Sequence, residues 1–301
     1  MKNKALLFVS IFCLFVNLAW AQTASNTIVS VKSTDFYYAA KTGISKLGGM
    51  TQFVKPGQKV GILINSAFDE KGAYVNPDIA IAVVVECFEA GASEVIGLQM
   101  ITNEYWQRSS LYERFKDVLA KVKMVESNVF PATYNETDYI RLDTIMGAKS
   151  LVKPEIVKAL FEVDVLINVP IAKHHATTKL TCAVKNMMGV CTRATNVGMH
   201  LKGPKRNDHD FLAQCIADLN LVRKPDLIVA DVTEVIITNG PGGPGEIAKH
   251  DRVVVGTDLV AMDAYCTQLI GFEPEDVYTT AKAAEHGLGE PDLSKVKILE
   301  F

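Results

Sequence analysis

The sequence predicts an α/β fold in which a mostly parallel sheet carries helices on both faces, as one domain or as two lobes of it. Hydrophobic residues make up 49% of the 301 residues, enough for a large buried core. Short apolar runs bounded by glycine or proline alternate with segments of helical periodicity, an alternation typical of parallel strands joined by helices. We find no linker, low-complexity tract or repeat, so residues 22–301 are interpreted as a single domain.

The first half of the chain predicts two strands and two helices. Strands are expected at 59–65 and 94–98, and helices at 77–90 and 104–122, followed by an extended stretch through Asp143. Asn76-Pro77 combines a polar cap with a first-turn proline, and Gly91 is placed to end the same helix.

The second half continues the alternation. Strands are expected at 164–169, 226–232, 253–256 and 296–299. Helices are expected at 154–161, 178–189, 211–222, 259–270 and 275–286. Glu273-Pro274 marks the start of the last helix and Gly287 its end, while Asp258 is a candidate N-cap for the helix that carries Asp263.

Residues 1–21 have the pattern of a secretory signal peptide. Lys2 and Lys4 precede an apolar run over 5–16, and Ala19-Trp20-Ala21 is a small-x-small cleavage site before Gln22. The apolar run is short for a bilayer span. We therefore expect an exported protein, periplasmic or secreted, with no stable membrane insertion after cleavage; an uncleaved anchor is the alternative.

Charge and cysteine content argue against several classes. Cleavage would remove Lys2 and Lys4, moving the formal net charge from -3 to -5, so no nucleic-acid partner is expected, and a local cluster of lysines points to a small anionic molecule. The remaining cysteines are odd in number and form no C-x-x-C pair, which argues against a cysteine-only zinc site and an iron-sulfur cluster. Cys182 and Cys191 could pair in an oxidising compartment.

The most informative stretch runs from the buried strand at 164–169 into the predicted helix at 178–189. On that helix one face would carry small or hydrogen-bonding residues: Thr178, Thr181, Cys182, Lys185, Asn186 and Gly189. Such a face also occurs on ordinary surface helices. Its position favours a binding site, because ligands of open α/β sheets lie beyond the carboxyl ends of strands.

Lysines and histidines gather around the same stretch. Lys173 and Lys185 would bind an anion together with Asn168, at the strand end, and Asn186. Histidine titrates near neutral pH. His174 is therefore the candidate general acid or base, and His200 is the second.

A glycine-rich segment, Gly240-Pro241-Gly242-Gly243-Pro244-Gly245, matches the letters of G-x-G-x-x-G. A dinucleotide site requires a helix to begin there, and residues 246–251 show no helical start. We expect instead a stiff turn in which Asn239, Gly240, Gly242 and Gly243 line a pocket.

Several residues could alternatively hold a divalent metal. His174, His200 and Cys182 are the candidate ligands, although their spacing matches no established metal motif. Asp231 and Asp263 could orient a lysine or histidine or contact the ligand. The sequence contains no G-x-S-x-G segment, so a standard serine hydrolase is not supported.

Taken together, these motifs resemble the domain of unknown function 362 family over about Val60 to Leu288. The matching segments are Asn168-Val169-Pro170, Lys173-His174, Leu180-Thr181, Lys185-Asn186 with Gly189, His200, Asn239-Gly240-Pro241-Gly242-Gly243 and residues 258–264, and Asn65 agrees with the polar residue that ends the family's first strand. The resemblance implies no specific activity. Many members carry an appended ferredoxin-like module with its cysteines, which this sequence lacks, so its cluster is not expected here. An analogy to nickel-pincer lactate racemases extends to the fold and to residue types.

Three functional hypotheses follow. In the first, the protein is an exported enzyme that binds a carboxylate- or phosphate-bearing substrate in a lysine- and histidine-lined cleft and transfers a proton, as racemases and isomerases do. In the second, the same pocket holds a metal or prosthetic group for a partner redox protein. In the third, the chain is a non-catalytic envelope protein.

Overall fold

The fold is built on one eight-stranded sheet, seen in a computed structural model that describes residues 26–125 and 136–301. The predicted signal peptide lies outside the described residues. The strand order is β12 (Lys297–Glu300), β1 (Thr27–Lys32), β11 (Ile247–Gly256), β10 (Leu227–Ile236), β7 (Val165–Val169), β2 (Lys59–Ile64), β3 (Glu94–Gly97) and β4 (Lys123–Met124).

The predicted mostly parallel sheet is confirmed. Strands β10, β7, β2, β3 and β4 are mutually parallel, as are β1 and β12. Only β11, among the strands of this described sheet, runs against its neighbours β1 and β10. The central strands β10, β7 and β2 are rich in valine, isoleucine and leucine because both faces of the sheet are covered.

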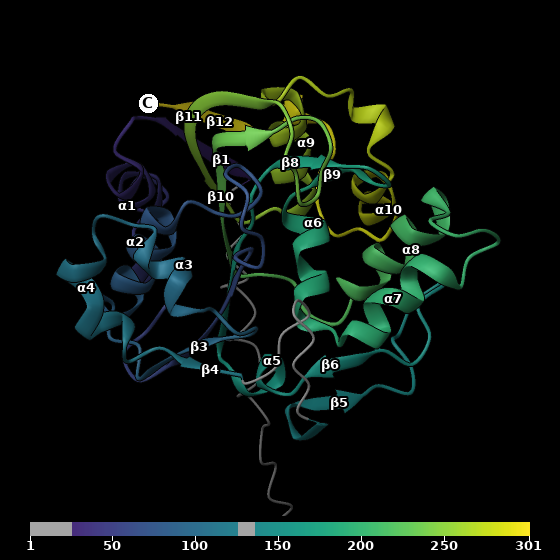
Figure 1. Ribbon diagram of the computed structural model, residues 1–301, viewed down its shortest axis with the longest axis horizontal. Coiled ribbons are helices and arrows are strands. Elements are labelled where there is room, and N and C mark those ends of the chain that lie inside the picture. The colour runs from purple at the N-terminus through teal and green to yellow at the C-terminus, as the bar shows by residue number, and fades with distance from the viewer. Residues whose placement is uncertain (1–25, 126–135) are drawn as a thin grey trace, which may run out of the picture.

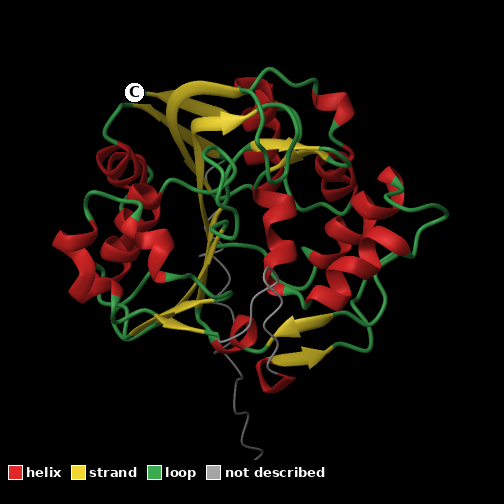
Figure 2. Cartoon of the chain, in the orientation of Figure 1, coloured by secondary structure: helices red, strands yellow, loops and turns green. Residues whose placement is uncertain are grey.

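Helices cover both faces of the sheet, as the sequence predicted (Figure 1). In Figure 2 the strands form a yellow band between two groups of red helices. One group comprises α1 (Phe36–Lys46), α2 (Pro77–Glu89), α3 (Asn103–Gln107) and α4 (Tyr112–Leu119). The other comprises α6 (Ala183–Asn186), α7 (Arg193–Leu201), α8 (His209–Leu219), α9 (Leu259–Leu269) and α10 (Tyr278–Glu285), and α5 (Ala159–Glu162) precedes β7. Within the described ranges, no helix is both long and apolar enough to cross a bilayer.

Two of the predicted helices are interrupted. The helix expected at 104–122 is divided into α3 and α4, because the Ser109 hydroxyl accepts a hydrogen bond from the Leu111 backbone and donates one to Asp78. The helix expected at 154–161 begins as β6 (Glu155–Val157), which pairs with β5 (Tyr139–Arg141) before α5 starts. Both differences arise from contacts made with residues distant in the sequence.

The prediction of one helix over 178–189 is wrong in its first half. Residues 173–181 instead form a hairpin of β8 (Lys173–His175) and β9 (Lys179–Thr181), in which Lys179 adopts a positive φ of 63°. The β-branched Thr181 suits extended backbone better than a helix, and residues 176–178 form the turn between the two strands. The helix α6 begins only at Ala183 and continues into a 3-10 turn over Met187–Val190.

The strand order places a switch point between β2 and β7. From β2 the chain proceeds to β3 and β4 on one side, and later to β7 and β10 on the other. Loops leaving the carboxyl ends of β2 and β7 therefore diverge, which leaves a crevice of the kind in which open α/β sheets bind ligands.

Candidate functional site

A cavity of about 400 Å³ lies in this crevice. Its polar lining comes from Asn65, Gln99, Lys173, His175, Thr181, Lys185, Asn186, Arg193, Asn196 and His200. Phe68, Met188, Val197 and Pro241 supply apolar wall. None of the described residues that line the cavity is an acid, so its electrostatic potential favours an anion.

Lys173 is the most buried basic side chain that lines the cavity, with 1% of its surface exposed. Its amino group donates a hydrogen bond to the Ala73 carbonyl oxygen and lies 3.9 Å from the centroid of the Phe68 ring. Burial lowers the pKa of Lys173 well below its usual value, and the positive charge of Lys185 lowers it further. The amine is therefore held in place by uncharged groups.

Lys185 projects into the cavity from α6. Its amino group lies 3.2 Å from the sulfur of Met188. Burial lowers the pKa of Lys185 to about 8, so at neutral pH the side chain is mostly an ammonium group available to an anionic ligand.

His175 and His200 form a pair of imidazoles on the cavity wall, with ring centroids 6.3 Å apart and planes inclined by 27°. The Nδ1 atom of His175 accepts hydrogen bonds from the backbone N–H groups of Thr177 and Thr178 at 3.1 and 3.2 Å. The ring proton of neutral His175 is therefore on Nε2. Burial, followed by the charge of Lys185, lowers the pKa of both histidines and keeps them neutral near pH 7.

The hydrogen bond of His200 gives its ring the opposite arrangement. Its Nδ1 atom lies 3.0 Å from Oδ1 of Asn207, an acceptor, so Nδ1 carries the proton and Nε2 carries the lone pair. The two histidines thus offer a donor and an acceptor.

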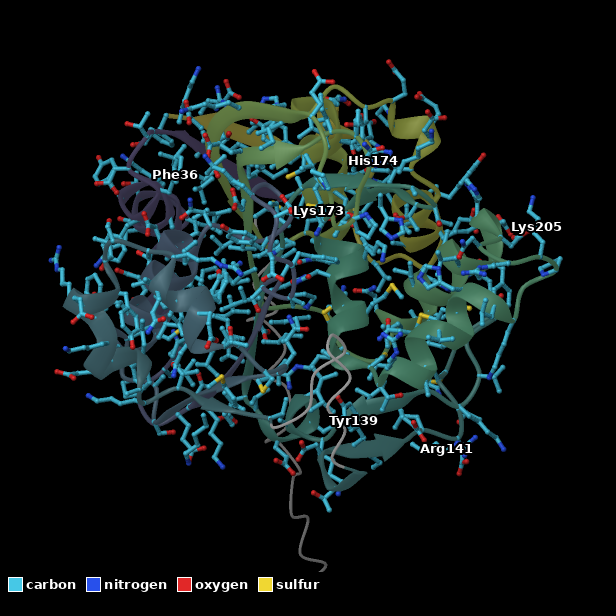
Figure 3. All side chains as sticks on the ribbon, in the orientation of Figure 1. Phe36, Tyr139, Arg141, Lys173, His174 and Lys205 are labelled. Carbon is cyan, nitrogen blue, oxygen red and sulfur yellow. The ribbon has the colours of Figure 1, made fainter. Side chains whose placement is uncertain are left out.

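His174 does not line the cavity. It lies between Lys173 and His175 on β8, and adjacent side chains of a strand point to opposite faces. Its Nδ1 atom accepts the Gly240 N–H at 2.9 Å, and its ring packs edge-on against Phe272. In Figure 3, Lys173 lies toward the centre of the molecule and His174 nearer its edge. The cavity histidine on this strand is therefore His175.

Three asparagines join β2, β7 and α6 beneath the cavity. The Asn186 amide nitrogen donates to Oδ1 of Asn168 at 2.7 Å and to the Leu63 carbonyl oxygen at 3.2 Å, while its oxygen accepts from Asn65 at 3.1 Å. Asn168 also donates to the Ala183 carbonyl oxygen at 2.9 Å. Asn168 is fully buried and positions α6, whereas Asn65 and Asn186 reach the cavity surface.

Thr181 lines the cavity and Thr178 does not. The Thr178 hydroxyl donates to the Leu180 carbonyl oxygen at 2.9 Å within the hairpin. The Thr181 hydroxyl is buried at the cavity wall, and no atom of the described residues hydrogen-bonds to it. Because an unpartnered buried hydroxyl is costly, this group is available to a ligand.

Asp263 lies behind α6 rather than in the cavity. Its carboxylate, fully buried on α9, accepts the Ala183 N–H at 2.6 Å and the Val184 N–H at 3.3 Å. Burial raises the pKa of Asp263 to about 7, although hydrogen bonds from Cys182 and from the two N–H groups oppose the shift. Asp263 therefore fixes the start of the helix that carries Lys185.

The cysteines take no part in the cavity. Cys87, Cys182, Cys191, Cys215 and Cys266 are buried free thiols, so the considered Cys182–Cys191 pair is not formed. The three candidate metal ligands also do not converge, because Cys182 contacts Asp263, His200 contacts His175, and His174 contacts the glycine-rich segment. Across the described residues, no three His, Cys, Asp or Glu side chains are grouped to hold a metal ion.

Asp231 does not line the cavity, and its carboxylate bonds to backbone groups. It accepts the N–H groups of Asn76 at 2.6 Å and Thr233 at 2.8 Å, and burial raises its pKa to about 6. Since Asn76 caps α2, Asp231 holds the start of that helix against β10.

The glycine-rich segment connects β10 to β11 and packs on the β8–β9 hairpin. A Cβ at Gly240 would lie 1.8 Å from the His174 carbonyl oxygen, so only glycine fits this contact. Gly242 and Gly243 pack near Phe68 and Glu70, and Asn239 turns back to the Pro244 carbonyl oxygen. From this segment Pro241 is the residue that lines the cavity.

The sequence did not indicate some of the cavity residues. His175 and Gln99 follow strands, and His175 could have been found from the two-residue period of β8. Arg193 and Asn196 come from α7, which was not predicted. Only the packing of α7 brings them to the cavity.

The family that the motifs indicate is confirmed by comparison with known families. The family described as domain of unknown function DUF362 matches residues 59–268. The chain belongs to the DUF362 family. The chain is similar in sequence to the thylakoid-associated protein sll1697 of Synechocystis. The two are 24% identical over 259 residues, which cover 82% of this chain and 74% of that protein.

Two solved structures are similar in part to this DUF362 chain. The lactate racemase apoprotein from Thermoanaerobacterium thermosaccharolyticum has a TM-score of 0.48 and 12% identity, and a protein from Thermotoga maritima has a TM-score of 0.44 and 13% identity. The matches cover 77% and 83% of this chain but only 54% and 59% of those chains.

Proposed function

We propose that this DUF362 chain is an enzyme that binds a small carboxylate- or phosphate-bearing molecule in the cavity and transfers a proton to or from it. The observation that supports this most directly is the cavity itself, which combines Lys173, Lys185 and Arg193 with two neutral imidazoles and, among its described lining residues, no carboxylate. Such a lining stabilises a bound anion and negative charge that develops on it.

The histidine pair would perform the proton transfer. The Nε2–H group of His175 is a donor and the Nε2 lone pair of His200 is an acceptor, as their Nδ1 partners dictate. A base removes a proton from carbon most effectively when its conjugate acid has a pKa near the working pH and when the resulting enolate is stabilised. The Lys185 ammonium group would stabilise the enolate.

Binding is tested by thermal unfolding of residues 22–301 with pyruvate, lactate or inorganic phosphate. We expect Lys185→Met to weaken binding about 10- to 100-fold, the loss for a charged hydrogen bond of about 1.5–3 kcal/mol. The exposed hairpin residue Lys179 provides the control, since Lys179→Met should bind normally. Equal binding by both variants would contradict the assignment of the anion to this cavity.

Proton transfer is tested by exchange of carbon-bound hydrogen in D₂O, followed by proton NMR of pyruvate or lactate. We expect exchange that is lost in His200→Asn while anion binding persists. Anion binding without exchange in the wild-type protein would favour the alternative of a binding or accessory protein.

A further inference from the structure

Lys173 and Thr181 form a pair of reactive groups that anion binding alone does not explain. They are directly opposite each other in the β8–β9 hairpin, so their side chains lie on the same face with Cβ atoms about 5 Å apart. Both side chains line the cavity, and Thr181 is 4% exposed. An amine and an unpartnered hydroxyl therefore face the same ligand space.

The surroundings of Lys173 differ from those of a lysine that binds an anion. Its amino group contacts a backbone carbonyl oxygen and an aromatic ring, and the cation Lys185 lies on the wall of the same cavity. Burial and the charge of Lys185 both favour the neutral amine, as the lowered pKa of Lys173 indicates. A neutral lysine amine is a nucleophile toward carbonyl carbon.

We propose that Lys173 forms an imine with a small 2-oxo acid whose carboxylate is bound by Lys185, with the Thr181 hydroxyl hydrogen-bonded to the reacting carbonyl oxygen. This inference rests on the proposed function, since it assigns the substrate class and a covalent step to the same cavity. The 2-oxo group supplies the electrophilic carbon, and the adjoining carboxylate supplies the negative charge that the cavity favours.

The step balances without an external oxidant or reductant. The lone pair of the Lys173 amine attacks the carbonyl carbon, a C–N bond forms, and the C=O π electrons move to oxygen. Proton transfer from nitrogen to that oxygen gives a carbinolamine, with Thr181 as its hydrogen-bond partner. The hydroxyl then leaves as water while the nitrogen lone pair forms the C=N bond. His175 donates its Nε2–H to the departing hydroxyl and takes the remaining proton from nitrogen at the same atom, so that the imine and the imidazole both end neutral. The imine makes the neighbouring C–H more acidic, which is the proton that His200 would remove.

The experiment is reductive trapping of the mature chain with cyanoborohydride in the presence of glyoxylate, pyruvate or 2-oxoglutarate, followed by peptide mass spectrometry. We expect one saturable adduct on Lys173, with the mass of the acid less water plus two hydrogens. Acetone, a ketone without a carboxylate, should give far less adduct at the same concentration. Mapping the adduct in the wild-type chain tests the proposal even if a variant fails to fold.

Variants separate the roles of the two residues. Lys173→Arg should abolish the adduct, and Lys179→Arg should leave it unchanged. Thr181→Val, which keeps the side-chain shape, should slow trapping about tenfold, the effect of one lost hydrogen bond. Trapping at exposed lysines alone, or no adduct on Lys173 with any of the three acids, would overturn the imine. If pyruvate still stabilises the protein through Lys185 in that case, the proposed function survives without it.

Discussion

The carboxyl group of Asp263 should make the stability of this protein depend on pH in a direction opposite to that of ion-paired aspartates. Two effects compete at this residue. Complete burial favours the protonated acid, and the N–H groups of Ala183 and Val184 favour the carboxylate. Burial prevails and raises the pKa from 3.8 to about 7.

The magnitude follows from this shift of about three units. Each unit corresponds to about 1.36 kcal/mol, so the shift is worth up to about 4 kcal/mol. Between pH 4 and 7 the folded chain retains a proton that the unfolded chain has lost. Its stabilising effect is fully present below pH 4 and is lost as the pH rises through 7.

The perturbation is Asp263→Asn, which has nearly the same shape and no titration. We expect the free energy of unfolding of the wild type, relative to that of the variant, to fall by up to about 4 kcal/mol between pH 4 and 8. Urea unfolding followed by circular dichroism measures this difference at each pH. Asp231→Asn is a second test with a smaller expected effect. Because the pKa of Asp231 is about 6, the free energy of unfolding of the wild type relative to this variant should fall by about 3 kcal/mol. A difference that stays constant or grows with pH would refute the reasoning, since it would mean that the N–H groups outweigh burial.

Three further predictions concern the cavity and the chain start. Gly240→Ala should destabilise the protein by about 3 kcal/mol in thermal or urea unfolding, because its Cβ would lie 1.8 Å from the His174 carbonyl oxygen. Gly242→Ala is the control and should destabilise it far less, since the nearest atom to its Cβ is at 3.4 Å. Equal losses of stability in the two variants would contradict the close packing of Gly240. Anion affinity measured by calorimetry should fall as the pH rises through 8, where the Lys185 ammonium group, with its pKa of about 8, loses its charge, and a flat profile would argue against Lys185 as the binding cation. If the predicted signal peptide is cleaved, the intact mass of the protein recovered after expression of residues 1–301 should correspond to a chain beginning at Gln22, and retention of residues 1–21 would indicate an uncleaved anchor.

Much of the candidate site could be predicted from local pattern. Lys173, Lys185, Asn186 and His200 line the cavity, and the first three lie in the segment that follows β7 beyond its carboxyl end. Thr181 was also expected there, but on the basis of a helix that does not exist at that position. The hairpin turns the same residue toward the cavity.

The structure places His175 at the cavity and His174 away from it, a distinction that local pattern did not indicate. Both residues follow the same strand, and a helix or loop gives no simple rule for which one faces the ligand. Once Lys173–His175 is a strand paired with β9, the two-residue period places Lys173 and His175 on one side and His174 on the other. The hairpin also contacts Gly240 through the His174 ring, a partner 66 residues away that short windows of sequence do not contain.

The sequence by itself determined the α/β class, the positions of the main buried strands and the residue types of the cavity, because hydrophobic periodicity and turn residues act over a few neighbouring positions. Tertiary structure decided the switch point between β2 and β7, the buried amide network around Asn168 and Asn186, and the neutral state of the histidines. These features depend on desolvation and on partners brought from distant parts of the chain, such as Asn65 and Asp263. Local propensity carries no information about how deeply a side chain is desolvated or about which distant residues contact it.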